Sequence, residues 1–256
     1  MSAIVTAVPK LGAPIILVHG LFGFNRVQVC GYTLANYFPG IPEFLEEAGN
    51  RVAAASLSPT MGIACRASQL KTFIDQQFPN EPVHILAHSM GGLDSRYMIS
   101  QLGMADRVLT LTTLGTPHRG STFADWGIRR LERLAKPLLE LFDFPHQAFY
   151  DLTTEKCKAF NEQVPNAPNV RYFSVAGRHP GVGWRGRMYL LYHFVRQAEG
   201  DNDGIVSLTS ANHGESCEIW DADHMHLVNW PDPTGPSTDR KENYANLLGR
   251  LADEGF

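Results

Sequence analysis

The sequence lacks concentrated positive charge, a long apolar run and a leader-like beginning. Its 22 lysine and arginine residues face 26 aspartate and glutamate residues, and no basic cluster stands out. Phosphate binding needs concentrated positive charge, so we expect no nucleic-acid partner. No apolar stretch approaches the roughly 20 residues of a transmembrane helix. Residues 1–10 show no signal peptide, so we expect a protein that is cytoplasmic or secreted by a leaderless route.

Closely spaced pairs of cysteines are also missing from the sequence. Cys30, Cys65, Cys157 and Cys217 lie far apart and form no C-x-x-C motif. We expect free thiols, with one disulfide as the alternative in an oxidising compartment. The 256 residues, 44% of them hydrophobic, contain no repeat and no long linker, so we expect a single domain over 1–256.

Short apolar runs rich in strand-forming residues recur along the chain. They cover residues 15–18, 52–55, 83–86, 108–112, 170–175 and 216–220. Most lack strict alternation, which is typical of parallel strands buried on both faces. Residues 67–78 and 93–102, which lie between these apolar runs, have apolar side chains at helical spacing. We therefore expect an α/β fold with a mostly parallel central sheet flanked by helices.

The alternation breaks over about 121–163, where we expect a helical lid or cap insertion. Apolar residues from Ile128 to Phe142 form one stripe, charged residues form the opposite face, and Pro137 interrupts the helix. The stripe is either permanently buried under a static cap or exposed by a mobile lid. The chain closes with a helix for which Asp239 and Glu242 are the expected capping pair.

The segment 83–93 predicts a nucleophile elbow. An apolar strand enters the turn Ala87-His-Ser-Met-Gly91, and a helix follows. Small residues on both sides of Ser89 let strand and helix approach while the serine projects from the turn. The first small residue is Ala87, where glycine is usual. A phosphate-binding loop, the alternative, would need more glycines and a lysine.

The segment 14–24 contains a second strand that ends in a turn, His19-Gly20. Acyl transfer develops negative charge on a carbonyl oxygen, which fixed backbone N–H groups stabilise. We expect Leu21 and Met90, the residue after the nucleophile, to supply these oxyanion donors.

A serine hydroxyl needs a histidine to remove its proton and a carboxylate to orient that histidine. Asp203 is the better-placed acid and Asp201 the alternative, although either aspartate could simply stabilise a turn. His224 follows the last strand and is the expected base, with His226 and His213 as alternatives. We expect His88 to pack against neighbouring loops. A metal site at His224 and His226, beside Asp221 and Asp223, lacks a convincing third ligand motif.

Several ordered motifs resemble those of bacterial triacylglycerol lipases of the α/β-hydrolase superfamily, near the Pseudomonas and Proteus lipases. They are His19-Gly-Leu-Phe-Gly-Phe24, His88-Ser-Met-Gly-Gly92, Gly115-Thr-Pro-His-Arg-Gly-Ser121, Leu152-Thr-Thr-Glu155, Asn202-Asp-Gly204 and the His224 loop. The resemblance implies the triad Ser89, Asp203 and His224, and a lid over an acyl pocket. The expected substrate-binding and lid residues are Phe22, Leu131, Leu134, Leu138 and Phe142.

One departure from these lipases concerns calcium. They typically hold an ion near the base, but His226 and Trp230 occupy the positions of two of its ligands. We expect no metal or cofactor, and a loop held by packing, with Trp220 and Trp230 as candidates.

The expected partners are a lipid or ester substrate and an oil–water interface. The expected activity is hydrolysis of triacylglycerols. The alternatives are a short- to medium-chain carboxylesterase with a static cap and a binding protein on a hydrolase scaffold.

Overall fold

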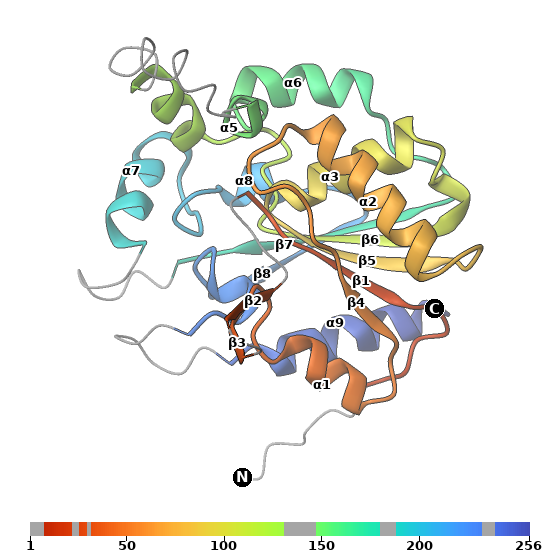
Figure 1. Ribbon diagram of the computed structural model, residues 1–256. Coiled ribbons are helices and arrows are strands. Elements are labelled where there is room, and N and C mark those ends of the chain that lie inside the picture. The colour runs from red at the N-terminus through yellow and green to blue at the C-terminus, as the bar shows by residue number, and fades with distance from the viewer. Residues whose placement is uncertain (1–7, 22–25, 30–31, 131–146, 180–187, 232–238) are drawn as a thin grey trace.

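Six parallel strands form the central sheet of the computed structural model (Figure 1), which describes residues 8–21, 26–29, 32–130, 147–179, 188–231 and 239–256. The order across the sheet is β4-β1-β5-β6-β7-β8. The strands are β1 (Ile15–Val18), β4 (Val52–Ala54), β5 (Val83–His88), β6 (Val108–Leu114), β7 (Arg171–Gly177) and β8 (Ser216–Trp220). The mostly parallel sheet expected from the sequence is confirmed, with each predicted run giving one strand.

Helices cover both faces of this sheet. On β1, Ile15 and Leu17 join a core with α1 (Ile41–Glu47) and α9 (Lys241–Asp253). Ile16 and Val18 join a second core on the opposite face. That face carries α2 (Ile63–Gln77) and α3 (Met90–Gln101), above the sheet in Figure 1. Burial on both faces explains why the strands read as continuous apolar runs.

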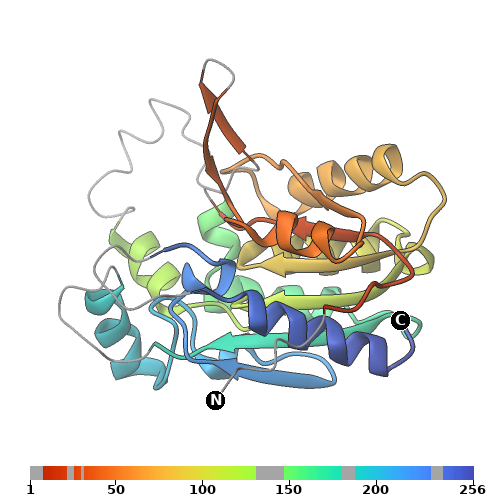
Figure 2. The same ribbon diagram turned by 90° about the horizontal axis from the view of Figure 1, so that it is seen from below.

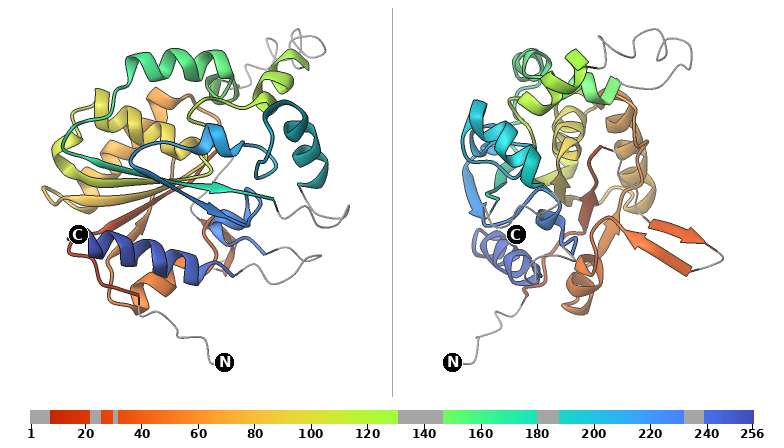
Figure 3. Two further views of the ribbon diagram at one scale, coloured as in Figure 1. Left: turned by 180° about the vertical axis from the view of Figure 1, so that it is seen from behind. Right: turned by 90° about the vertical axis from the view of Figure 1, so that its left-hand side faces the viewer.

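The remaining helical elements are short or peripheral to the two cores just described. They are α5 (Gln147–Asp151), α6 (Thr154–Gln163), α7 (Tyr189–Glu199), α8 (Leu208–Ala211), and the 3-10 turns η1 (Ala105–Arg107) and η2 (His226–Val228). The strands β2 (Arg26–Val29) and β3 (Tyr32–Asn36) form an antiparallel hairpin that the sequence did not predict. The hairpin projects from the body of the molecule in Figure 2. Residues 122–130 are helical and lie beside α7 (Figure 3).

Three details complete or correct the expectations. The predicted capping pair of the last helix is wrong: Arg240 occupies the N-cap, and Asp239 instead accepts a hydrogen bond from Lys241 N–H at 3.1 Å. Cys65, Cys157 and Cys217 are free thiols, and Cys30 lies outside the described residues. No helix in the described part of the chain is long and apolar enough to cross a membrane.

Candidate active site

Ser89 occupies the sharp turn between β5 and α3. Its backbone has φ 55° and ψ −130°, a region that costs a non-glycine residue about 1–3 kcal/mol. Two contacts hold the turn: Ser89 N–H donates to the Leu114 carbonyl at 2.9 Å, and the Thr116 hydroxyl donates to the Ser89 carbonyl at 2.7 Å. A strained serine at the carboxyl end of a buried strand is the geometry of a nucleophile elbow.

The small residues around this turn have a steric reason. A Cβ on Gly91 would lie 2.8 Å from the His19 carbonyl oxygen, and one on Gly92 would collide with the Thr116 side chain. Ala87, in place of the usual glycine, is completely buried in the core beneath the turn. The departure at the first flank therefore leaves the elbow intact.

Asp203 and His224 form a buried pair. His224 Nδ1 lies 2.7 Å from Asp203 Oδ2, and His224 N–H donates to the Asp203 carbonyl at 2.8 Å. The other carboxylate oxygen, Oδ1, accepts from the N–H groups of Ile205 and Val206 at 2.9 and 2.8 Å. One carboxylate oxygen of Asp203 thus bonds its own turn and the other bonds the His224 ring, an arrangement compatible with either interpretation of this aspartate.

Gly115 explains part of the motif that follows β6. Its φ is 56°, and a Cβ there would lie 2.9 Å from Asp203 Oδ2 and 3.2 Å from His224 Nδ1. Only a residue without a side chain leaves room for the Asp203–His224 pair at this point.

The alternative acid and bases have other surroundings. Asp201 is exposed to solvent. His226 Nδ1 lies 3.4 Å from Asp223 Oδ1. His213 bonds to Asn166 at 3.0 Å, and burial lowers the pKa of His213 to about 3.

The turn after β1 holds its peptide groups firmly. The His19 carbonyl accepts a 2.8 Å hydrogen bond from the buried guanidinium of Arg66. The His19 ring accepts from Leu57 N–H at Nε2, at 3.0 Å, which leaves Nδ1 as the donor to the Gly20 carbonyl at 2.9 Å. Burial lowers the pKa of His19 to about 4, so the ring is neutral at pH 7. Because a peptide group is planar, fixing the Gly20 carbonyl also fixes the direction of Leu21 N–H.

Met90 is the first residue of α3 and is fully buried. The N–H groups of a helix's first turn have no partner within the helix, so they can face a ligand. Arg66, which holds the opposite turn, also pairs with Asp94 of α3 at 2.8 Å. Burial raises the pKa of Asp94 to about 7, against the opposing effect of Arg66. This ion pair ties the elbow helix to the turn that carries Leu21.

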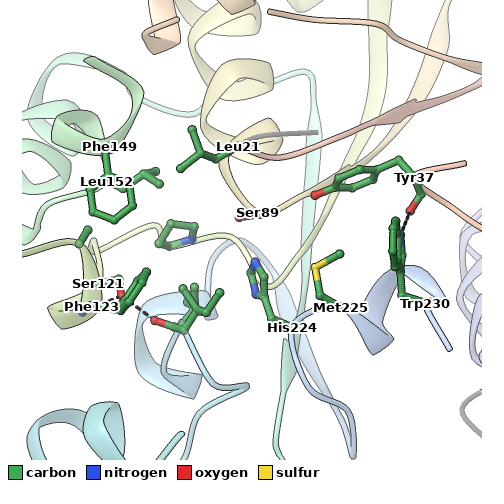
Figure 4. Close-up of a pocket in the computed structure, with 14 residues that line it drawn as sticks. Leu21, Tyr37, Ser89, Ser121, Phe123, Phe149, Leu152, His224, Met225 and Trp230 are labelled. Atoms are coloured by element: carbon green, nitrogen blue, oxygen red, sulfur yellow. Dashed lines mark hydrogen bonds between the residues drawn. The ribbon is translucent and has the colours of Figure 1, made fainter. Parts of the chain in front are cut away.

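An apolar cavity of about 320 Å³ opens over Ser89. Of the three candidate bases, only His224 lines it. In Figure 4, Ser89 lies between one side with Phe149 and Leu152 and another with Tyr37 and Trp230. The remaining lining residues are Leu21, Pro117, Ser121, Phe123, Ala124, Ile205, Val206 and Met225.

The expected insertion lies only partly within the described residues. Helical residues 122–130 are anchored at two points: Thr122 N–H donates to Glu199 of α7 at 2.7 Å, and Asp125 accepts from Thr154 N–H at 2.9 Å. The expected lid and substrate-binding residues lie outside the described residues. These are Phe22, Leu131, Leu134, Leu138 and Phe142.

The loop expected to lack calcium is held by hydrogen bonds as well as packing. Trp230 Nε1 donates to the Tyr37 carbonyl at 2.8 Å, while Trp220 is buried against the Tyr244 ring. Within the described residues, no group of three or more His, Cys, Asp or Glu side chains is placed to hold a metal ion. The absence of calcium stays a prediction.

The sequence did not reveal Tyr37, Arg66 or Phe149 as parts of the site, and it singled out Trp230 only as a packing residue of the loop that carries the base. Tyr37 follows the unpredicted hairpin, and the others come from segments without a motif. No local signal marks them, because each reaches Ser89 or its turns only through the tertiary fold.

The parallel sheet, its flanking helices and the serine turn after β5 define an α/β-hydrolase fold. Solved structures share it: a mature Bacillus licheniformis lipase superimposes with a TM-score of 0.71 at 23% identity, covering 94% of each chain. A metagenomic carboxyl esterase gives a TM-score of 0.77 at 17% identity, over 96% of this chain and 78% of the esterase.

Residues 64–211 match the model of the PGAP1-like alpha/beta domain, and the chain belongs to this family. A Vibrio cholerae protein named triacylglycerol lipase is 38% identical over 247 residues, covering 79% of this chain and 74% of that protein. Triacylglycerol lipase 2 of Saccharomyces cerevisiae is 29% identical over 248 residues, covering 86% and 74%.

Proposed function

We propose that this protein is a lipase that hydrolyses the carboxylic ester bonds of triacylglycerols, with Ser89 as nucleophile, His224 as base and Asp203 as the acid that orients it. Relatives named triacylglycerol lipase support the activity. The observation that carries the residue roles is Ser89 in a strained turn, beneath an apolar cavity that it shares with the Asp203-bound His224.

The mechanism follows from these positions. His224 takes the Ser89 proton as the hydroxyl oxygen attacks the ester carbonyl, and Asp203 stabilises the resulting imidazolium. The N–H groups of Leu21 and Met90 donate hydrogen bonds to the carbonyl oxygen and so stabilise the negative charge that develops on it. His224 then protonates the departing alcohol, leaving an acyl group on Ser89. A water molecule activated by His224 releases the acid by the same steps in reverse.

A short- to medium-chain carboxylesterase is the second candidate, and one observation favours it. The anchors at Thr122 and Asp125 attach residues 122–130 to α7 and α6, as a static cap requires. A mobile lid and action at an oil–water interface therefore need movement beyond residue 130. We retain the lid and its residues as proposals.

The test is acid release from tributyrin and triolein on either side of the solubility limit. Triolein cleavage that rises once an emulsion forms indicates a lidded lipase, whereas activity confined to dissolved tributyrin indicates the esterase. Ser89→Ala and His224→Ala should each lose about 10⁴-fold or more in kcat while remaining folded by circular dichroism. Substantial activity in His224→Ala would transfer the base role to His226 or His213.

A further inference from the structure

We propose that Tyr37 and His88 are positioning residues that connect the oxyanion turn at Gly20 to the loop of the base His224. Gly20 N lies 3.1 Å from the Tyr37 hydroxyl, which lies 2.8 Å from His88 Nδ1. His88 Nε2 lies 2.9 Å from the His224 carbonyl oxygen. This inference rests on the proposed function, because it assigns a role within the same reaction.

The two end groups of this series of hydrogen bonds, Gly20 N–H and the His224 carbonyl, determine the direction of each bond in it. The His224 carbonyl can only accept, so His88 Nε2 carries a proton. In a neutral imidazole, Nδ1 is then an acceptor, and the Tyr37 hydroxyl must donate to it. The Tyr37 oxygen is left to accept from Gly20 N–H. Each donor meets one acceptor along the chain.

The surroundings keep this arrangement in a single protonation state. His88 is fully buried and Tyr37 is 6% exposed. Burial first, and then the nearby His224 and His19 rings, hold the pKa of His88 well below its usual range. Burial raises the pKa of Tyr37 to about 12. Both groups are therefore neutral at any pH at which the enzyme would work. No proton moves along this series of hydrogen bonds, because the series ends on the amide carbonyl of His224.

The Tyr37 hydroxyl completes the restraint on the oxyanion turn. The peptide group between His19 and Gly20 is held at its oxygen by Arg66 and at its N–H by Tyr37. The next peptide group, which carries Leu21 N–H, is held at its oxygen by the His19 ring. Without the hydroxyl, the first peptide group is held only at its oxygen and can rotate. This rotation would turn the Leu21 N–H away from the position where the oxyanion forms.

The connection matters because two charges appear together during attack by Ser89. Negative charge forms at the oxygen near Leu21, and positive charge forms on His224. A buried link between the two segments keeps their separation constant through this step. Misplacement by about 1 Å costs on the order of 10²-fold in rate. The predicted effect is thus on kcat and not on substrate binding.

The experiment compares Tyr37→Phe with Tyr172→Phe, using a soluble short-chain ester. Tyr172 is a matched control: its buried hydroxyl accepts from Ala167 N–H at 3.1 Å, outside the cavity. We expect Tyr37→Phe to lower kcat by about 10- to 100-fold, with KM changed less than about twofold. Tyr172→Phe should lower the melting temperature comparably but leave kcat within about twofold. Equal kcat for the two variants overturns the proposal.

The second arm tests whether Tyr37 and His88 act as one unit. His88→Gln retains a donor for the His224 carbonyl but lacks the ring acceptor for Tyr37. Substituting two members of one unit is non-additive, so the double variant should lose little more kcat than the worse single variant. Losses that multiply contradict the coupling. His84→Gln, on the same buried strand, is the control for loss of a buried ring.

Ser89→Ala separates the two proposals. If it remains active, the proposed function itself fails. If it is inactive while Tyr37→Phe keeps full kcat, only the positioning role fails.

Discussion

The two sides of the pocket are built differently. On the Ser89 side, the turns of Gly20, Ser89 and Asp203 are held by directional hydrogen bonds to backbone groups. On the apolar side, the side chains of Phe149 and Leu152 pack with a neighbouring hydrophobic cluster. Directional bonds tolerate little displacement, whereas packing tolerates changes of shape at modest cost. Substitutions in these turns should therefore change the catalytic rate. Substitutions on the apolar side should change which acyl chains of a substrate fit.

After the losses expected of Ser89→Ala and His224→Ala, the largest effect should come from Asp203→Asn. The amide can keep an acceptor for Ile205 and Val206 N–H, but it no longer stabilises a positive His224. We expect kcat to fall about 10³- to 10⁴-fold, with the melting temperature nearly unchanged.

Asp201→Asn is the control for that substitution, because Asp201 is exposed and only two residues away. Its kcat should match that of the unmodified protein. The sequence leaves Asp201 as the alternative acid. Residual activity of Asp203→Asn that disappears in the double variant would restore that idea.

This division also explains how much could be predicted from the sequence. Ser89 and Gly20 lie in local turns whose residue types the chemistry dictates, so short motifs reveal them. Asp203 and His224 follow strands in the expected order, which restricts the candidates to a few. Tyr37 and Arg66 act through contacts across the fold, and such contacts leave no local pattern. The packed side is harder still, since many apolar residues could fill the same space.

Acid should lower the stability of the fold, because several buried histidines are neutral in the folded protein. Burial lowers the pKa of His19 to about 4, and it holds the pKa of His88 well below its usual range. His84, His118 and His213 are shifted in the same direction. The unfolded chain binds protons at these groups near pH 6.5, before the folded protein does. The free energy of unfolding is therefore highest above pH 6.5 and falls as the pH drops toward 4.

Each such histidine contributes a slope of about 1.4 kcal/mol per pH unit within its window. Asp94 opposes them: its pKa, raised to about 7, removes stability as the pH rises from about 4 to 7. Urea unfolding at pH 7.5, 6 and 5 measures the sum. We expect a net loss of stability toward acid, shallower in His84→Gln, which removes one group far from Ser89. A flat profile contradicts buried neutral rings.

A smaller effect should follow from Leu152→Trp on the packed side. The indole ring is larger than the leucine side chain and fills part of the cavity. Long acyl chains therefore lose contacts, while short acyl chains still reach Ser89. We expect the ratio of kcat/KM for octanoyl to butyryl esters to fall by about 10-fold, a change typical of one or two methylene groups. An unchanged ratio, with both values reduced, would mean that this side does not contact the acyl chain.

The smallest expected effect is that of calcium chelation, because side chains already join the segments around the base. Asn229 donates to the Pro39 carbonyl at 2.8 Å and accepts from Arg240 N–H at 2.7 Å. EDTA should leave the melting temperature within about 1 °C. Asn229→Gly keeps a residue suited to the left-handed backbone, φ 68°, but removes both bonds. It should cost about 2 kcal/mol, or several degrees. If EDTA lowers the melting temperature and calcium restores it while Asn229→Gly changes nothing, an ion and not this amide holds the loop.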